Sequence, residues 1–272
     1  MFETILNYYA YYGLQFSPYD YNEKFKPLDY FTNYPKLTNE VILDYCTLRQ
    51  LQGVKNATIN RELTVLRSAI NYYNKHFETD IPNPLNGFKL QEMDYMPKYL
   101  NEWQCKRLLD ACDQYPNKAF YVYVYLLINT GCRSSELLTL TWSNVDFERR
   151  YFVVRNSLSK NKKTVYKPLN NQSLRVFDQL PFIHSQWVFY NPKTDNRYKT
   201  FRRAWLWALE QSGLSCRIHD LRHTFASLLV SQGVPLYHVS QLLGHSDTRI
   251  TQRYAHLSPD NLASVVGLLP EL

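Results

Sequence analysis

The sequence predicts a mainly α-helical fold with a small antiparallel β-sheet, an α+β chain organised as two lobes. Three patterns support this prediction. Apolar residues recur at helical spacing through residues 58–76. Prolines, asparagines and a glycine then interrupt the pattern within residues 81–97. After Trp142 the pattern changes to short strand-like runs separated by a turn, which is typical of a small sheet.

The composition is that of a globular chain of 272 residues, enough for one large core or two ordinary ones. No apolar run is long enough to cross a bilayer, and the first residues lack the basic start and apolar stretch of a signal peptide. The cysteines are odd in number and lack C-x-x-C spacing, which argues against a disulfide framework or a cysteine-only zinc site. We therefore expect a reducing, cytoplasmic location. The five cysteines are Cys46, Cys105, Cys112, Cys132 and Cys216.

The net charge of +7 and the pI near 9.0 fit a polyanionic partner, although many basic proteins bind none. Residues 1–92 contain nine Lys and Arg against ten Asp and Glu, whereas residues 93–272 contain 22 against 14. Between the two parts, Pro82, Pro84 and Pro97 stop helices. We interpret this break as an extended linker between two lobes; a long loop within one domain is the alternative. The expected divisions are an N-terminal segment of the first lobe at 1–36, a helical domain at 37–88, the linker at 89–97 and a second domain at 98–272.

The first lobe is predicted to be helical. A helix starts after Thr38, and the longer helix at 58–76 is expected to be capped by Thr58, with Glu62 soon after. Its buried face comprises Ile59, Leu63, Leu66, Ile70 and Tyr73. Another face holds short polar groups and one cation of the kind that contact phosphates, although an ordinary solvated face has the same composition. These candidate DNA-binding residues are Thr64, Ser68, Asn71 and Lys75.

Residues 1–36 are crowded with tyrosines. Such a density suits base stacking, but it more often reflects packing around a short helix, and we expect packing. The residues are Tyr8, Tyr9, Tyr11, Tyr12, Tyr19, Tyr21, Tyr30 and Tyr34.

The second lobe is predicted to start with a helix after Leu100, followed by the strongly apolar run F-Y-V-Y-V-Y-L-L-I-N. The Val/Tyr alternation of this run also suits a strand, but the G-C-R that follows it, together with the family resemblance given below, favours a buried helix. Gly131 allows a turn that places Arg133 at the start of the next helix, where a guanidinium can hold phosphate oxygens bidentately. Glu136 lies one turn further on and can hold Arg133 in position. A surface salt bridge is the ordinary alternative for an arginine.

The strand-like region contains V-D-F and Y-F-V-V-R around the turn E-R-R, which predicts a hairpin, and T-V-Y-K-P-L, which predicts a third strand. The segment between the last two strands is a basic tip that contains Lys160, Lys162 and Lys163. Contacts to backbone phosphates or plain solvation are the ordinary alternatives for such lysines.

Near the C-terminus, His219 and Arg222 are three residues apart, so a helix places them on one face. Arg222 and Arg133 together can clamp both non-bridging oxygens of a phosphodiester, where negative charge develops during attack. His219 can take a proton or hydrogen-bond the phosphate, and His245 supplies another donor.

A metal site is the rival interpretation of the same segment. His219 and His223 have H-x-x-x-H spacing, and Cys216 lies nearby. The segment lacks the glutamate of H-E-x-x-H, however, and Arg222 would repel a cation. We therefore expect no metal and no other cofactor.

Tyr254 is the candidate nucleophile. A phenol attacks poorly near neutral pH because its pKa is about 10, but adjacent cations and a base make attack feasible. The product is a tyrosyl phosphodiester, which stores the bond energy so that the strand can be rejoined without ATP. Among 23 tyrosines, its position nine residues after His245 distinguishes this one.

The motifs T-G-C-R-S-S-E-L-L-T-L, S-L-S-K-N-K-K-T, R-I-H-D-L-R-H-T-F-A-S, L-L-G-H-S-D and I-T-Q-R-Y-A-H resemble the tyrosine recombinases, the phage integrase family, over about residues 37–272. The resemblance implies a helical core-binding domain followed by a catalytic domain. It also implies that a hairpin lysine, Lys160 or alternatively Lys162, protonates the departing 5′-oxygen, and that His223 is structural. The implied catalytic residues are Arg133, Lys160, His219, Arg222, His245 and Tyr254.

The resemblance further implies a site-specific DNA recombinase, the integrase of a phage or another mobile element, that forms a 3′-phosphotyrosyl intermediate. Expected partners are double-stranded DNA, three further copies in a tetramer, and accessory DNA-bending or directionality proteins, with a nucleoid-associated location in a prokaryote. The apolar tail after Ser258 would dock on a neighbouring copy or on its own lobe. Residues 1–36 are too short and too little basic for an arm-site-binding domain. The alternatives are a type IB topoisomerase-like nicking and resealing enzyme and a DNA-binding relative without catalysis.

Overall fold

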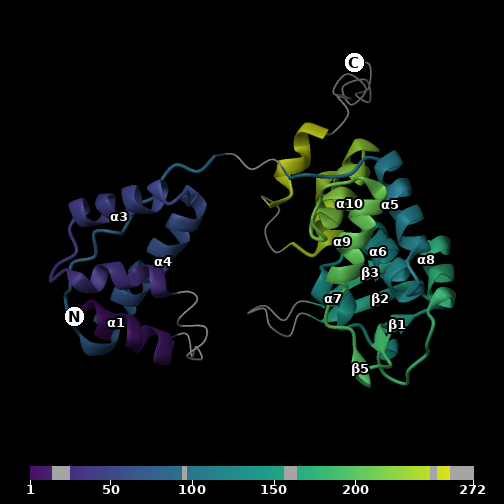
Figure 1. The fold of residues 1–272 in the computed structure, drawn as a ribbon, viewed down its shortest axis with the longest axis horizontal. Coiled ribbons are helices and arrows are strands. Elements are labelled where there is room, and N and C mark those ends of the chain that lie inside the picture. The colour runs from purple at the N-terminus through teal and green to yellow at the C-terminus, as the bar shows by residue number, and fades with distance from the viewer. Residues whose placement is uncertain (14–24, 94–96, 156–163, 246–249, 258–272) are drawn as a thin grey trace, which may run out of the picture. The chain divides into compact units, whose positions relative to one another are not determined.

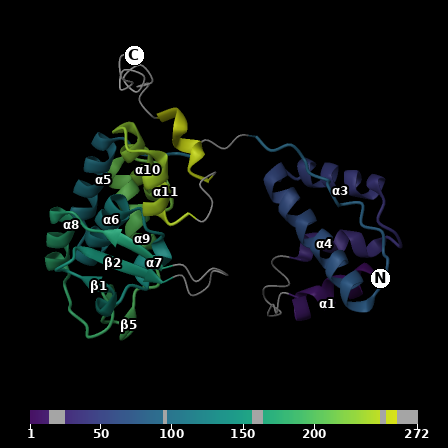
Figure 2. The ribbon, with the colours of Figure 1, turned by 180° about the vertical axis from the view of Figure 1, so that it is seen from behind.

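The structure, a computed structural model, describes residues 1–13, 25–93, 97–155, 164–245 and 250–257. The chain separates into two compact units, Met1–Tyr95 and Met96–Leu272, each with its own core (Figures 1 and 2). Helices predominate and the strands form small antiparallel sheets, which confirms the predicted α+β class. Among the described residues, no helix has the length and apolar character needed to span a bilayer.

The first unit is entirely helical in its described part. Helix α4 is its longest element, and both α1 and α3 pack against it. The face of α4 predicted to be buried does lie in the core, where it meets Phe2, Ile5 and Leu6 of α1. The elements are α1 (Phe2–Tyr8), a π-helical turn (Tyr9–Gly13), a 3₁₀ helix (Lys26–Asn33), α3 (Asn39–Leu51) and α4 (Asn56–Phe77).

A buried polar cluster joins α3 to α4. Glu62 accepts a hydrogen bond from the phenol of Tyr45 at 2.8 Å and two from the guanidinium of Arg49 at 2.6 and 3.1 Å. The predicted capping of α4 by Thr58 is wrong: the helix begins at Asn56, after Lys55, whose side chain makes no capping bond. Glu62 therefore contributes to tertiary packing rather than to a helix start, because three hydrogen bonds offset the cost of burying its carboxylate.

The tyrosines of the N-terminal segment differ in their surroundings. Tyr8 contacts the rings of Tyr72, Tyr73 and Phe77 on α4, and Tyr30 contacts Tyr45 on α3. These contacts confirm packing for part of the set. Two others are exposed, Tyr11 and Tyr12, and two lie outside the described residues, Tyr19 and Tyr21.

The second unit is built around α6, the apolar run that the sequence predicted to be a buried helix. Helices α5 and α10 pack against α6, and α9 packs against α5. Helix α5 starts with a reciprocal pair of capping bonds between Asn101 and Gln104. The helices are α5 (Glu102–Gln114), α6 (Lys118–Thr130), α7 (Ser134–Leu138), α8 (Asn171–Arg175), α9 (Arg202–Ser212), α10 (Asp220–Ser231) and α11 (Leu236–Leu243), with 3₁₀ helices at Trp142–Asn144, Val176–Gln179 and Gln252–Leu257.

The predicted three strands form one antiparallel sheet in the order β1 (Val145–Asp146), β2 (Tyr151–Arg155) and β3 (Thr164–Pro168). Both views place this sheet at one end of the helices, next to α7 (Figures 1 and 2). A second, two-stranded sheet joins β4 (Tyr190–Asn191) to β5 (Asn196–Arg197). In the larger sheet, Lys167 of β3 pairs with the fully buried Phe152 of β2. The sheet thus directs a lysine into the interior of the unit.

Candidate active site

Arg133 lies directly before α7, as the sequence predicted. Helix α6 ends at Thr130, and Gly131 reverses the chain with φ of 59°. The Arg133 guanidinium donates to Glu136 at 2.7 Å, and Glu136 also accepts a bond from the Arg133 backbone N–H at 2.7 Å. The Arg133 side chain is 41% exposed and that of Glu136 is 13% exposed. Glu136 therefore orients a guanidinium that remains partly exposed to solvent.

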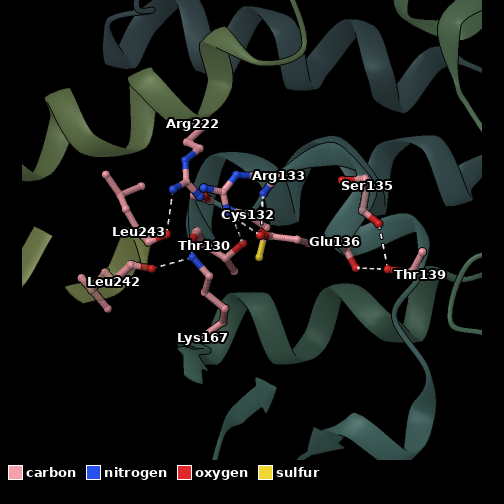
Figure 3. Close-up of polar contacts among 11 residues, drawn as sticks. Thr130, Cys132, Arg133, Ser135, Glu136, Thr139, Lys167, Arg222, Leu242 and Leu243 are labelled. Carbon is pink, nitrogen blue, oxygen red and sulfur yellow. Dashed lines mark hydrogen bonds and ion pairs between the residues drawn. The ribbon is translucent and has the colours of Figure 1, made fainter. Parts of the chain in front are cut away.

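Arg222 extends from α10 and is almost completely buried, at 4% exposure. Its Nη1 donates to the carbonyl of Gly131 and its Nη2 to that of Leu243, both at 2.7 Å (Figure 3). Burial, followed by the charge of Arg133, lowers the pKa of Arg222 to about 10. The guanidinium is therefore still charged at neutral pH, and two of its five donors are engaged with main-chain carbonyls.

Lys167 lies beside Arg222 and was not singled out from the sequence. It is 1% exposed, and its Nζ donates to the carbonyls of Thr130, at 3.3 Å, and Leu242, at 2.5 Å. Figure 3 shows Lys167 and Arg222 approaching the same two helix ends. Burial is the main cause that lowers the pKa of Lys167. A lysine within a strand that reads T-V-Y-K-P-L carries no signal that it is buried, so sequence reasoning missed it.

Tyr254 lies in the 3₁₀ helix Gln252–Leu257, which packs against α10, and is 2% exposed. Its phenolic oxygen is 2.5 Å from Nδ1 of His223, a buried residue of α10. The sequence offers His219 either as the proton acceptor or as a donor to the phosphate, and its ring contacts that of His223 edge to face at 5.2 Å. Among the described contacts, the structure therefore places His223 at the candidate nucleophile.

The electrostatic environment keeps the histidines neutral. Burial, then the charge of His219, lowers the pKa of His223 to about 4. Burial, then Arg222, lowers the pKa of His245 to about 4. His219 is an exposed residue, yet partial desolvation and then Arg222 lower the pKa of its ring as well. All three imidazoles are thus uncharged at neutral pH and can accept one hydrogen bond while donating another.

His245 follows Gly244, which ends α11 with φ of 69°. Its Nδ1 lies 2.9 Å from the hydroxyl of Thr251. Arg133 and Arg222 both influence its pKa, and both also influence that of His219. The positive charges of Arg133 and Arg222 therefore act on both His219 and His245.

The remaining predicted residues do not all fall within the described chain. Lys160, Lys162 and Lys163 lie outside the described residues, between the paired ends of β2 and β3. The tail after Ser258 is also outside them. On α4, Thr64, Asn71 and Lys75 are exposed and Ser68 is half-buried, so the four residues follow one accessible stripe. Thr64 is held by bonds to Asn60 and Arg67, and Asn71 accepts a bond from Asn83. Among the described residues, no three His, Cys, Asp or Glu side chains gather as metal ligands would.

Comparison with known proteins assigns the chain to a family. The profile of the phage integrase family matches residues 98–261, and the chain belongs to that family. The integrase of Haemophilus phage HP1 is 34% identical over 217 residues, which cover 79% of this chain and 60% of the phage protein. The integrase of Salmonella phage P22 is 33% identical, covering 61% of this chain and 45% of that protein. The chain thus spans about half the length of these relatives.

Solved structures support the same fold. The catalytic domain of the phage HP1 integrase is 30% identical and matches with a TM-score of 0.52, covering 63% of this chain and 95% of that domain. The integrase of transposon Tn1549, in complex with a circular intermediate DNA, matches with a TM-score of 0.78, covering 99% of both chains at 18% identity. A lambda integrase dimer bound to a core site matches with a TM-score of 0.73 at 17% identity, covering 93% of this chain and 94% of that one. The last two show the fold alone.

Proposed function

We propose that this chain is a site-specific DNA recombinase, the integrase of a phage or another mobile element, which cleaves and rejoins strands through a 3′-phosphotyrosyl intermediate. The observation that carries the proposal is the buried contact between Tyr254 and His223 beside the region of Arg133, Arg222 and His245. This combination provides a nucleophile, a neutral base and two guanidiniums for one phosphate. Membership in the phage integrase family agrees with it.

In the proposed cleavage step, the Tyr254 oxygen attacks the scissile phosphorus, the new O–P bond forms and the bond from phosphorus to the 5′-oxygen breaks. Arg133 and Arg222 hold the non-bridging oxygens, and His219 and His245 donate further hydrogen bonds to them. The 5′-oxygen takes its proton from Lys160, for which Lys162 is the alternative. Religation is the reverse, with the 5′-hydroxyl of another strand attacking the phosphotyrosine.

His223 is the residue that we assign to the phenol proton, in place of His219. Its Nδ1 already faces the Tyr254 oxygen, and its lowered pKa leaves a lone pair free at neutral pH. A bound phosphodiester brings negative charge near the histidines, which raises their pKa and strengthens them as bases. Because Tyr254 is 2% exposed, its ring must also turn outward before it reaches a phosphate.

The proposed partner is double-stranded DNA. The second unit would bind the scissile phosphate, and the α4 stripe of Thr64, Ser68, Asn71 and Lys75 would contact backbone phosphates. We further propose that four copies assemble on two duplexes, joined by the tail after Ser258, with accessory DNA-bending or directionality proteins. The proposed location is the nucleoid of a prokaryotic cytoplasm, in keeping with five cysteines that are all unpaired.

The test is a nicked duplex that carries the attachment site next to the chain's own gene and traps the covalent intermediate. Wild type is expected to form an SDS-resistant adduct in the presence of a chelator, and Tyr254→Phe is expected to form none. An adduct that persists in Tyr254→Phe would reject Tyr254 as the nucleophile. If wild type binds the duplex but forms no adduct, the protein would instead be a DNA-binding relative without catalysis. If the protein relaxes a supercoiled plasmid without exchanging strands between two sites, it would be a nicking and resealing enzyme.

A further inference from the structure

Two cations connect the ends of two helices that are far apart in the sequence. Helix α6 ends with the carbonyls of Thr130 and Gly131, and α11 ends with those of Leu242 and Leu243. Lys167 bonds to the first carbonyl of each pair, and Arg222 bonds to the second carbonyl of each pair (Figure 3). We define these four bonds as the double bridge. Helix C-termini have unsatisfied carbonyls and partial negative charge, so cations stabilise them.

The double bridge lies directly before two candidate site residues. Arg133 is two positions after Gly131, and His245 is two positions after Leu243. Each of the two loops starts with a glycine at positive φ, so the chain turns sharply directly after the double bridge. The double bridge therefore fixes the distance between the loop that presents Arg133 and the loop that presents His245.

Burial of Lys167 in the core has a cost in free energy. A strand residue opposite Phe152 normally has an apolar side chain, and a methionine of similar length would fill the space without desolvating an ammonium group. The partners of Lys167 are neutral main-chain carbonyls, while Arg222 and Arg133 lie close enough to lower its pKa. A bound anion beside Arg222 and Arg133 would offset this effect and favour the charged form of Lys167.

We propose that Lys167 is a positioning residue for the phosphate-binding site, distinct from the hairpin lysine that would protonate the leaving group. Together with Arg222 it holds the Arg133 and His245 loops at the spacing that a phosphodiester requires, and it contributes positive charge beneath them. This inference rests on the proposed recombinase function.

The test compares Lys167→Met with Lys167→Arg in the full-length chain, using the trapping duplex with a normal scissile phosphodiester or with a neutral methylphosphonate at the same position. Adduct formation is followed in a single turnover at saturating DNA, and DNA affinity is measured separately. Val154→Ala is the matched control, because it removes buried apolar volume from β2 of the same sheet without altering the double bridge. Thermal melts define a temperature at which every variant is folded.

Lys167→Met is expected to slow adduct formation on the phosphodiester by about 30-fold or more, with DNA affinity within about threefold of wild type. The deficit should shrink on the methylphosphonate, because a neutral phosphorus centre needs less cationic stabilisation. Lys167→Arg keeps the charge and the donors, so it should react within about fivefold of wild type. Val154→Ala should react normally on both duplexes.

A folded Lys167→Met that reacts at the wild-type rate, or that loses the same factor on both duplexes, would overturn the proposal. If Lys167→Met does not fold, the rate of adduct formation by Lys167→Arg decides. A fall in this rate of more than fivefold that is equal on the two duplexes overturns the proposal. A near-normal rate, or a fall that differs between the duplexes, supports it. Failure of the recombinase assignment is separately visible, because wild type would then form no adduct.

Discussion

The phenolic oxygen of Tyr254 lies 2.5 Å from Nδ1 of His223, and both side chains are buried. The two residues are 31 positions apart and meet because the 3₁₀ helix Gln252–Leu257 packs against α10. In this contact, His223 can either accept the phenol proton during attack or hold the phenol away from DNA. The two roles predict opposite effects when the histidine is replaced.

Replacing His223 with Gln retains a hydrogen-bond acceptor but removes the base. We expect the single-turnover rate of adduct formation to fall about 100-fold, the usual contribution of a general base, with DNA affinity unchanged. His219→Gln, which alters the neighbouring ring, is the matched comparison and should cost less at the cleavage step. A faster rate in His223→Gln would show that the contact restrains the nucleophile instead.

Replacing Glu136 with Gln removes the charge that orients Arg133, whose guanidinium donates to Glu136 at 2.7 Å. We expect adduct formation to slow about tenfold, since the guanidinium must then be ordered by the phosphate itself. Glu102→Gln is the control, because Glu102 forms an exposed ion pair with Lys106 on α5. Equal rates for Glu136→Gln and wild type would mean that Arg133 needs no orienting partner.

Alanine at Gly131 should be far more damaging than alanine at Gly233, although both glycines have positive φ. A Cβ on Gly131 would lie 2.4 Å from Cδ1 of Phe225, whereas one on Gly233 would meet nothing within 4 Å. We expect Gly233→Ala to lower the free energy of unfolding by about 1 kcal/mol through backbone strain alone. Gly131→Ala should lower it by about 3 kcal/mol because the clash adds to the strain. Urea unfolding monitored by circular dichroism checks both values.

Acid should destabilise the second unit through its buried histidines. The pKa values of His223 and His245 are about 4 in the folded chain, below the ordinary 6.5, so the unfolded chain binds more protons between these values. Their contribution is complete above about pH 6.5 and is lost as the pH falls toward about 4. Between about pH 7 and about pH 5 we expect the free energy of unfolding to fall by about 1 kcal/mol per histidine, after allowing for partial exposure of His245.

The measurement is urea unfolding at these two pH values for wild type, His223→Gln and His245→Gln. Each variant should show a smaller loss of stability on acidification than wild type does. His76→Gln changes an exposed histidine of the first unit and should leave the pH dependence as it is in wild type. Identical pH dependence in all four proteins would contradict the argument.

Salt dependence tests the α4 stripe. Lys75 is exposed on that stripe, and removal of one phosphate contact lowers the slope of log affinity against log salt concentration by about 1. We therefore expect Lys75→Ala to bind DNA with a slope reduced by about that amount, irrespective of base sequence. Lys89→Ala is the control, since Lys89 pairs with Glu92. An unchanged slope in Lys75→Ala would remove this face from the DNA interface.

The helices that the sequence predicted well are those whose evidence is local. Thr38 accepts a bond from the backbone of Val41, and Asn101 and Gln104 cap α5 reciprocally, both within one turn of the chain. The same reasoning failed for Thr58, because α4 already begins at Asn56, and Glu62 instead joins a hydrogen-bonded cluster with α3. Short-range patterns cannot reveal such contacts, because they depend on a helix that packs from elsewhere in the chain.

By itself, the sequence determined the α+β class and the family, together with the candidate set of arginines, histidines and tyrosine, because helical spacing and short motifs record these directly. Only the tertiary structure decided that His223 is the histidine in contact with Tyr254 and that Lys167 shares two helix ends with Arg222. The partners of Lys167 are main-chain carbonyls at positions 130 and 242, and every residue has a carbonyl. No side-chain pattern can therefore mark that bond, which exists only once packing brings the two helix ends together.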